Sequence, residues 1–396
     1  LENNFDFSEI EFNIENTSSD TYLKGDNIVS KTRDGNYQSL LNSFAKFDLS
    51  SEDLNIFAEI AAYEDLTKEK NSDKFQYILP NFTISKLLGN NSNSKGNLNY
   101  KISGSSQKKN TNVKESFLIN DLIYKSDFFF SGYGTISTYE LEFKNSLKKG
   151  KNSSKYKDDT QSENFSAFIF NSSIPLKKDY KNYTGNLSPK FNVRYSPNKS
   201  ENLSDLDRKI NITNIFSKNR LGLNDSIEGG KSLTVGFDYN LKTRENNDFL
   251  EFSLGQIFKD NEDKKLPLTS KMQNKSSDIV GNFNFQPNNQ FKLDYDFSFD
   301  NNLDTVNYSK VETQLSINNF VTSFDFLEEN DDIGSDSYLF SDVRYNFNEN
   351  NSVSYNTRRN RKTDLTEYYN LIYEYKNDCL IAGIKYNKSY YEDRDL

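Results

Sequence analysis

The residues of this sequence that could perform chemistry are mainly carboxylates, because histidine is absent. The chain holds 58 aspartates and glutamates, one cysteine and no histidine. Without histidine there is no Ser-His-Asp or Cys-His nucleophile system, no histidine-ligated zinc and no imidazole base near neutral pH. A carboxylate pair could still supply an acid and a base, but among 58 such residues any spacing arises by chance. The sequence therefore predicts no enzyme, no metal site and no cofactor.

Composition and charge narrow the class of protein further. The 396 residues include 27% charged and 14% aromatic side chains, and the formal net charge is -9. An acidic chain without a clustered basic face does not suit phosphate backbones, so nucleic acid is not an expected partner. No window approaches a helical membrane span, and the first residues contain no apolar signal-peptide core. If the protein is exported, we expect this chain to be a mature fragment.

Alternation of apolar and polar residues predicts β-strands along the chain. In the segment 290–300, QFKLDYDFSFD, every second residue is Phe, Leu or Tyr, and the residues between them are Lys, Asp and Ser. The same period of two occurs at 98–102, 191–195, 233–241 and 250–254. No comparably long stretch has a helical period. Each strand should therefore present two faces that meet different surroundings.

Short turns and longer loops alternate in the last third of the chain. The short turns are expected at 286–290, 318–319, 348–351 and 376–378, and the longer loops at 300–307, 327–337 and 358–366. In an antiparallel meander every second connection lies on the same side of the sheet, so the two kinds sort to opposite sides. Transmembrane barrels have short periplasmic turns and long outer loops. The lysine-rich run 144–157 is expected to be a flexible loop.

These patterns predict an all-β fold, a large antiparallel transmembrane β-barrel that forms one domain over residues 1–396. At about 17 residues for a strand with its connection, the chain gives on the order of 22 to 24 strands, and the complete domain roughly 22 to 26. A β-sandwich would not sort its connections by length, and a β-solenoid would show a short fixed repeat. A passive porin or a substrate-specific channel would share every one of these features.

The stretch 214–259 carries the most specific motif of the sequence. It contains, in order, Phe216, Asn219, Arg220, Asp225, Glu228, Gly229, Gly230, Ser253, Gly255, Gln256 and Phe258. This order resembles the barrel domain of the LptD family, also called Imp or OstA, of lipopolysaccharide-assembly proteins. Ser226 stands where that family usually has arginine, which leaves an Asp-Arg pairing in this loop open. Weaker matches at 187–198, at 19–26 and around Cys379 extend the resemblance over almost the whole chain.

The resemblance implies lipopolysaccharide transport and assembly at the outer membrane of a Gram-negative bacterium. In this family lipopolysaccharide passes from a periplasmic bridge through the barrel lumen and leaves by a lateral gate between the first and last strands. The implied partners are lipopolysaccharide, outer-membrane lipids, an LptE-like plug lipoprotein, an LptA-like bridge protein and the barrel-assembly machinery. The family's N-terminal periplasmic jelly-roll domain and a last closing strand are expected to lie outside this chain. The alternative function is a passive porin or a substrate-specific channel.

The resemblance also implies roles for the motif residues. A loop that folds into the lumen or caps it would hold Asn219, Arg220, Asp225, Glu228, Gly229, Gly230 and Gln256. Arg220 could pair with carboxylates there because a lumen is partly shielded from bulk screening. The alternative is an ordinary solvated loop. The two glycines are expected to serve backbone geometry rather than ligand contact.

Cys379 follows a short turn, on the side inferred to be periplasmic, where a thiol can be oxidised. The resemblance implies a disulfide from Cys379 to the N-terminal domain. The alternative is an unpaired small apolar side chain.

Two further groups of residues are candidates for lipid contact. A basic cluster on the loop expected at 358–366 could bind lipopolysaccharide phosphates, since arginine matches phosphate geometry, or could simply be solvated; it comprises Arg358, Arg359, Arg361 and Lys362. The lateral gate would lie at the first and last strands, around Phe5, Phe7, Ile10, Phe12, Leu380, Ile384 and Tyr386. The alternation of the first strand slips between Phe7 and Ile10, which predicts a bulge that weakens pairing.

Overall fold

The structure is a computed structural model that describes residues 7–20, 40–68, 70–89, 95–109 and 112–389 of the chain. Over these residues it contains 21 β-strands, one four-residue α-helix and two short 3-10 helices. Hydrogen bonds join the 21 strands into one sheet, and every strand pair whose register is given is antiparallel. The prediction of a large antiparallel all-β fold is confirmed. No helix in the described part of the chain is long and apolar enough to cross a membrane.

The strands of the first half are β1 (Phe7–Asn13), β2 (Leu40–Ser50), β3 (Leu54–Asp65), β4 (Phe75–Leu87), β5 (Gly96–Lys109), β6 (Val113–Ser126), β7 (Phe129–Phe130), β8 (Ile136–Lys151), β9 (Gln161–Ser173), β10 (Leu176–Asp179) and β11 (Tyr183–Ser196). Those of the second half are β12 (Gly230–Thr243), β13 (Asp248–Lys259), β14 (Ile279–Asn288), β15 (Phe291–Phe299), β16 (Val306–Ile317), β17 (Phe320–Glu329), β18 (Ser337–Asn348), β19 (Asn351–Asn360), β20 (Leu365–Lys376) and β21 (Ile381–Ser389). The helices are α2 (Asn71–Lys74), η2 (Leu268–Ser270) and η3 (Asp331–Ile333).

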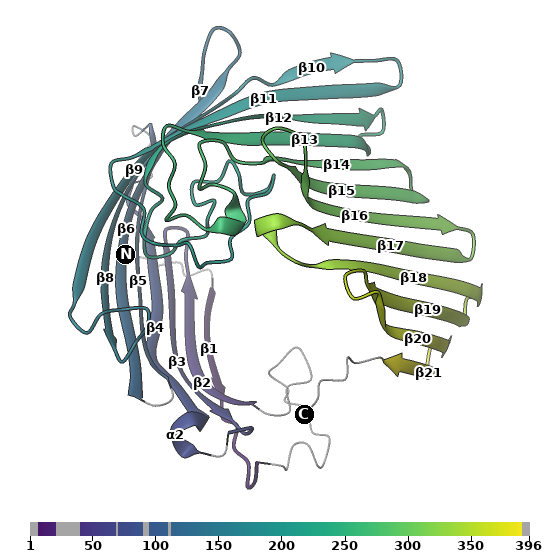
Figure 1. Ribbon diagram of the computed structural model, residues 1–396, viewed down its shortest axis with the longest axis horizontal. Coiled ribbons are helices and arrows are strands. Elements are labelled where there is room, and N and C mark those ends of the chain that lie inside the picture. The colour runs from purple at the N-terminus through teal and green to yellow at the C-terminus, as the bar shows by residue number, and fades with distance from the viewer. Residues whose placement is uncertain (1–6, 21–39, 69, 90–94, 110–111, 390–396) are drawn as a thin grey trace. The chain divides into compact units, whose positions relative to one another are not determined.

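The chain divides into two compact units. Unit 1 comprises Leu1–Asp127, Tyr139–Phe168 and Asn224–Ile227, and unit 2 comprises Phe128–Thr138, Ile169–Leu223 and Glu228–Leu396. Most strands pair with their neighbours in chain order (Figure 1), and β6 pairs with β8 and β9 with β11, past the short strands β7 and β10.

In unit 1 the first strand pairs regularly with the second. The register between β1 and β2 runs without interruption from Phe7 opposite Ser50 to Asn13 opposite Phe44. The bulge predicted between Phe7 and Ile10 is therefore wrong, because hydrogen bonding to β2 keeps β1 in register although the apolar alternation slips. Phe5 lies outside the described residues.

In unit 2 the connections sort by side as the sequence predicts. Between β12 and β21 the short turns are 244–247, 289–290, 318–319, 349–350 and 377–380, and they share one side because successive strands are antiparallel. The opposite side carries the connections 197–229, 260–278, 300–305, 330–336 and 361–364. We call these the short-turn side and the long-loop side. The long loop predicted at 358–366 is wrong, since the strands extend into it and leave only 361–364.

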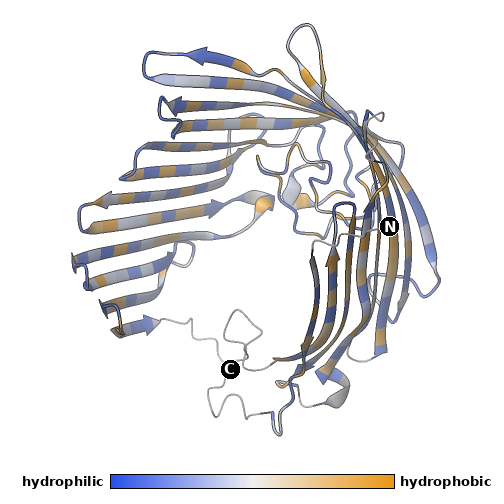
Figure 2. Ribbon diagram, turned by 180° about the vertical axis from the view of Figure 1, so that it is seen from behind, coloured by the Kyte–Doolittle hydropathy of each residue, from blue (hydrophilic) through white to orange (hydrophobic). Residues whose placement is uncertain are grey.

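The two faces of the unit 2 strands meet different surroundings, as the alternating colours along the strands in Figure 2 illustrate. On β11 the side chains of Asn192 and Arg194 are buried, whereas Phe191, Val193 and Tyr195 are exposed. We call the first face the inner face and the second the outer face. This arrangement inverts that of a soluble protein, because the apolar residues point away from the covered side.

The inner face of unit 2 is covered by the two longest connections of the long-loop side. Their apolar residues form one buried cluster with the sheet: Leu203, Ile210, Ile215, Leu221, Leu223, Leu266 and Met272 from the connections, Ile257 from β13 and Val280 from β14. The connections 197–229 and 260–278 therefore fold back onto the sheet instead of extending into solvent. The apolar side chains of these two connections stabilise this packing because they are removed from water.

Glycines on the inner face make room for this covering layer. Gly236 of β12 lies directly opposite Gly255 of β13. A Cβ on Gly255 would lie 3.2 Å from the Phe216 ring and 3.3 Å from Ile215, and a Cβ on Gly236 would lie 2.9 Å from Phe216. The missing side chains let the segment around Phe216 reach the backbone of the sheet.

We predict that Gly236→Ala destabilises the protein more than Gly255→Ala. A Cβ on Gly236 would approach the Leu254 carbonyl oxygen to 2.2 Å, so the backbone itself must move, whereas at Gly255 only side chains need to give. We expect Gly236→Ala to lower the free energy of unfolding by about 1–3 kcal/mol and Gly255→Ala to lower it by less. The measurement is the temperature at which heating unfolds the protein, detected as a change in its mobility on a gel. Equal midpoints for the two variants would contradict a close approach at Gly236.

Candidate functional site

The centre of the motif predicted from the sequence is a buried ion pair in unit 2. The Arg220 guanidinium donates from Nε to Glu228 Oε2 at 2.8 Å and from Nη2 to Glu228 Oε1 at 2.5 Å. The two side chains are only 1% and 4% exposed. Arg220 also donates to the hydroxyls of Ser232 at 2.9 Å and Thr234 at 3.2 Å. Since both hydroxyls belong to β12, the pair fastens the 197–229 connection to the inner face of the sheet.

The charge of Glu228 is maintained by its arginine neighbours. Burial raises the pKa of this carboxyl, but the charge and hydrogen bonds of Arg220, with a further contribution from Arg194, outweigh it and bring the pKa below its ordinary value of 4.5. Arg194 also donates to the backbone carbonyls of Lys218 and Glu228. A charged pair in so buried a place persists only because nearly every polar atom finds a partner.

Three further motif residues, Asn219, Gly229 and Gly230, relate to the backbone conformation of the 197–229 connection. Asn219 accepts from the Leu223 amide at 2.7 Å and donates to the Leu223 carbonyl at 2.6 Å, which closes a turn next to Arg220. Gly229 passes so close to Asn198 that a Cβ would lie 2.3 Å from its carbonyl oxygen, and Gly230 has a φ of +87°. These two features agree with a role of the glycines in backbone geometry, which stays a prediction.

Asp225 lies apart from the Arg220 pair and belongs to unit 1. Its carboxylate is 3.5 Å from Lys148 Nζ and 3.5 Å from the Tyr156 hydroxyl. The neighbouring Ser226, at the position where the resembled family has arginine, is buried. The cation beside Asp225 is therefore the lysine of β8.

The inner side of β8 in unit 1 is a strip of buried polar residues: Glu140, Glu142, Lys144, Ser146 and Lys148. Lys144 Nζ lies 2.7 Å from Asp121 and donates to the Asn224 carbonyl at 2.9 Å. The prediction of a flexible loop at 144–157 is wrong for its first half, because β8 continues to Lys151. Ion pairing to neighbouring strands and to 224–225 allows these lysines to be part of a covered strand.

Gln256 is not part of the Arg220 cluster. It donates to the Ser277 carbonyl at 3.0 Å and to Asn301 at 2.7 Å, and the flanking Gly255 and Ile257 point to the opposite face of β13. It thus holds the end of the 260–278 connection and the 300–305 loop together. Next to it a polar depression of about 870 Å³ opens on the long-loop side, with a lining that includes Asn274, Asp278, Asp300, Asn301, Asn302, Thr305, Asn307 and Asn330.

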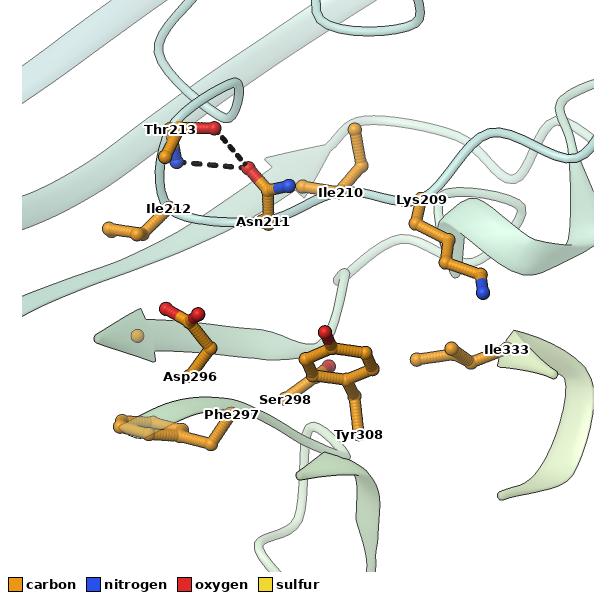
Figure 3. Close-up of a pocket in the computed structure, with 11 residues that line it drawn as sticks. Lys209, Ile210, Asn211, Ile212, Thr213, Asp296, Phe297, Ser298, Tyr308 and Ile333 are labelled. Atoms are coloured by element: carbon orange, nitrogen blue, oxygen red, sulfur yellow. Dashed lines mark hydrogen bonds between the residues drawn. The ribbon is translucent and has the colours of Figure 1, made fainter. Parts of the chain in front are cut away.

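A smaller cavity of about 150 Å³ lies between the 197–229 connection and strands β14 to β16 (Figure 3). Ile210 and Ile212 lie on one side of it and the rings of Phe297 and Tyr308 on the other, as Figure 3 shows. Lys209, at its edge, forms an ion pair of 2.6 Å with Glu329. A space of this size and lining suits a ring-sized apolar group or a few waters.

Asp278 separates the cavity from the polar depression. Its Oδ2 accepts from Ser298, which lines the cavity, and from Asn307, which lines the depression, each at 2.8 Å. Burial raises the pKa of this carboxyl, and the two hydrogen bonds oppose the rise only in part. No group of three or more His, Cys, Asp or Glu in the described residues could hold a metal ion.

The three arginines of the basic cluster form ion pairs with carboxylates. Arg358 and Arg359 lie in β19, where they pair with Glu367 at 3.1 Å and Asp364 at 2.5 Å. Arg361 lies in the following turn and is 3.4 Å from Glu328. Lys362 occupies the same turn. The placement of the cluster on a long loop is therefore wrong, because cross-strand pairing extends β19 to Asn360.

Cys379 and the residues proposed for the gate lie near the chain ends. Cys379 is a free, exposed cysteine in the 377–380 turn on the short-turn side of unit 2, and Leu380 precedes β21 in the same turn. Ile384 and Tyr386 are exposed on β21. In unit 1, Ile10 and Phe12 are exposed on β1, which begins at Phe7.

Several residues of the site are missed by sequence reasoning. Arg194, Ser232 and Thr234 complete the Arg220 pair, and Lys144 and Lys148 complete the polar strip of β8. A signal did exist for Arg194, Thr234 and Lys144, since each stands at a polar position of a strand in which the alternate residues are mainly apolar. A charged residue at such a position marks the inner face.

A double-mutant cycle should show that Arg220 and Glu228 act as one unit. Arg220→Met or Glu228→Leu alone should lower the free energy of unfolding by about 3–5 kcal/mol, because each leaves a buried charge without its partner. The double variant should recover much of this loss. The measurement is denaturant unfolding in lipid, with Arg359→Met as the control for an exposed pair. Strict additivity of the two single effects would rule out direct coupling.

The pH dependence of stability should carry the signature of Glu228. Because its pKa is lower in the folded protein than its ordinary 4.5, its contribution is present above that value and is lost as the pH falls through the folded-state pKa. Unfolding temperatures of the wild type should fall more steeply with acid below pH 4.5 than those of Glu228→Gln. Parallel pH curves would show that the carboxylate is not held as an ion.

The chain is similar to one known protein family and, in fold, to several solved structures. The family model described as "LptD: LPS transport system D" matches residues 2–338. The comparison with curated proteins finds no match. Among solved structures, a mutant ferric enterobactin receptor PfeA of Pseudomonas aeruginosa aligns with a TM-score of 0.39 and 9% identity over 85% of this chain and 64% of its own. The siderophore receptor PirA of Acinetobacter baumannii gives 0.41 and 12% over 87% and 65%.

The chain thus spans less than two thirds of the length of these receptors, and the family match carries the assignment. It extends over residues 2–338 of 396 and includes the Arg220 pair and both long connections. The chain belongs to the LptD family, the LPS transport system D proteins, and is an outer-membrane protein of a Gram-negative bacterium.

Proposed function

We propose that this chain moves lipopolysaccharide to the cell surface and carries out no bond chemistry of its own. The observation that carries the proposal is the family match over residues 2–338, because that family transports lipopolysaccharide and is not a family of enzymes. The polar inner faces support it.

The cargo is an amphiphile, so a conduit needs separate paths for its sugars and its acyl chains. In unit 2 the inner face also carries polar side chains that are only half-buried, among them Asn240, Glu251 and Asn282. Such surfaces suit hydroxyls and phosphates of a glycan. The polar depression on the long-loop side, rich in asparagine, would offer further hydrogen bonds to sugars.

The acyl chains need an apolar exit, which we assign to the first and last strands. Ile10 and Phe12 of β1 are 63% and 74% exposed, and Ile384 and Tyr386 of β21 are 74% and 61% exposed. Exposed apolar side chains of this kind suit contact with acyl chains. Phe5, Phe7 and Leu380 would extend the same gate.

We infer the proposed protein partners from the family to which the chain belongs. An LptE-like plug, an LptA-like bridge protein reached through an N-terminal domain, and the barrel-assembly machinery are inferred from the family alone. The single thiol, Cys379, is exposed, so a disulfide would need a cysteine from outside this sequence. The arginines at 358, 359 and 361 would bind phosphate only by exchanging their carboxylate partners.

A depletion experiment tests the proposed function. Cells in which the gene is switched off should lose newly made lipopolysaccharide from the surface and accumulate it internally, and expression of the wild-type protein should restore export. The Arg220→Met, Glu228→Leu double variant should restore export less well, because the 197–229 connection is no longer fixed by charge. The measurement is surface labelling of pulse-labelled lipopolysaccharide. Normal surface labelling during depletion would contradict the proposal.

The runner-up function is a passive porin or substrate-specific channel. Liposomes that contain the purified protein distinguish it, since a porin should admit small sugars at rates that depend only on their size. We expect little sugar flux, because the connections 197–229 and 260–278 cover the inner face of unit 2. Rapid, size-dependent flux together with normal lipopolysaccharide export in depleted cells would favour the porin.

A further inference from the structure

Two neighbouring hairpins of unit 2 expose aromatic side chains on the short-turn side. The first joins β7 to β8, and in it Phe128, Phe130 and Tyr133 are 67%, 72% and 94% exposed. The segment 128–138 contains no charged residue. Large aromatic side chains gathered without charge on a surface indicate contact with another apolar phase or molecule.

The turn of this hairpin is built to hold its aromatic residues outward. The Ser131 amide donates to the Thr135 carbonyl at 3.1 Å, and the Gly134 amide donates to the Ser131 carbonyl at 3.0 Å. The Thr135 and Ser131 hydroxyls are 2.6 Å apart. Because these bonds satisfy the backbone of the turn, Tyr133 is presented by a formed structure rather than by a loose chain.

The second hairpin joins β10 to β11 and adds positive charge. Leu176 and Tyr180 are 50% and 45% exposed, and the segment 174–183 holds three lysines, at 177, 178 and 181, against one aspartate. Lys178 Nζ lies 5.1 Å above the Tyr180 ring. This hairpin therefore offers ammonium groups next to apolar surface.

A row of rings runs along the outer face from the first hairpin to β11, the strand that follows the turn of the second hairpin. Phe129 of β7 lies 6.2 Å from Phe170 of β9, and Phe170 lies 5.9 Å from Phe191 of β11. Phe191 alternates with the buried Asn192, so the row belongs to the outer face. The first hairpin is thus continuous with the face that meets lipid in an outer-membrane protein. Tyr180 of the second hairpin lies on the same face, since a Cβ on Gly185, which is in phase with Phe191, would lie 3.1 Å from its ring.

We propose that these two hairpins form an anchor for anionic phospholipid at the short-turn side. The rings at 128, 130, 133 and 180 enter the interfacial layer, where amphipathic aromatic residues are most stable. The lysines at 177, 178 and 181 bind the phosphates of the headgroups, and each basic residue near an anionic surface adds attraction. The occupant is a lipid surface because the apolar part continues the outer face and the charged part complements anionic headgroups.

The absence of tryptophan from the sequence permits a direct test. Tyr133→Trp and, separately, Phe130→Trp introduce one fluorophore at the first hairpin of the intact protein in nanodiscs. Leu206→Trp is the matched control, because Leu206 is also exposed but lies in the connection that covers the inner face. With phospholipid brominated near the top of the acyl chains, we expect a blue-shifted, strongly quenched emission for both hairpin variants and little quenching for the control.

The headgroup is tested in the same system. In anionic nanodiscs the quenching of Tyr133→Trp should exceed that in zwitterionic ones, and Lys177→Gln with Lys178→Gln should abolish the difference. An emission maximum typical of water with no bromine quenching in either hairpin variant would overturn the anchor and would point to a protein partner. Quenching of equal strength in anionic and zwitterionic nanodiscs would overturn the preference for anionic phospholipid. Lipopolysaccharide export is not needed for either result, so the proposed function can fail independently.

Discussion

The buried pair of Arg220 and Glu228 fixes the layer that covers the inner face of unit 2. It brings two charges into a place where they are 1% and 4% exposed, and the hydroxyls of Ser232 and Thr234 accept from two further donors of the guanidinium. A buried ion pair contributes little net stability compared with apolar residues of the same size. What it contributes here is a single position for the 197–229 connection, since any other position would leave one of the charges unpaired. The glycines at 236 and 255, the turn at Asn219 and the close passage of Gly229 all depend on that position.

The polarity of the chain follows from the same arrangement. A sheet whose outer face meets lipid must place its polar residues inward, and large covering connections must then find apolar contacts among themselves. This explains how a chain with a mean hydropathy of -0.84 can still form a buried cluster such as that around Ile215 and Met272. The polar strip of β8 in unit 1 obeys the same rule, with lysines held inward by carboxylates. Polar inner faces are also what the transport of a glycan requires.

The parts of this structure that follow from local pattern could be predicted, and those that depend on distant partners could not. Alternation placed the strand at 290–300 within one residue of β15. The motif placed Arg220 in one connection with carboxylates that it could pair with, and in the structure its partner is Glu228. The regular register of β1 depends on β2, and the continuation of β8 through its lysines depends on Asp121 and Glu163, so neither is visible in the local sequence. Arg358 and Arg359 were misplaced for the same reason, because pairing of β19 with β20 continues to Asn360.

Transport along the inner face is tested most directly by identifying which face of the sheet contacts lipopolysaccharide in living cells. Asn240 and Tyr239 are adjacent on β12 near the short-turn side and point to opposite faces, Asn240 to the inner and Tyr239 to the outer. A photo-crosslinking amino acid is placed at each position in turn. The two variants then differ only in the face of the sheet from which the crosslinker captures a neighbour. We predict that newly made lipopolysaccharide is captured from position 240 and not from position 239. Capture from position 239 alone, or from neither position while export continues, would contradict transport along the inner face.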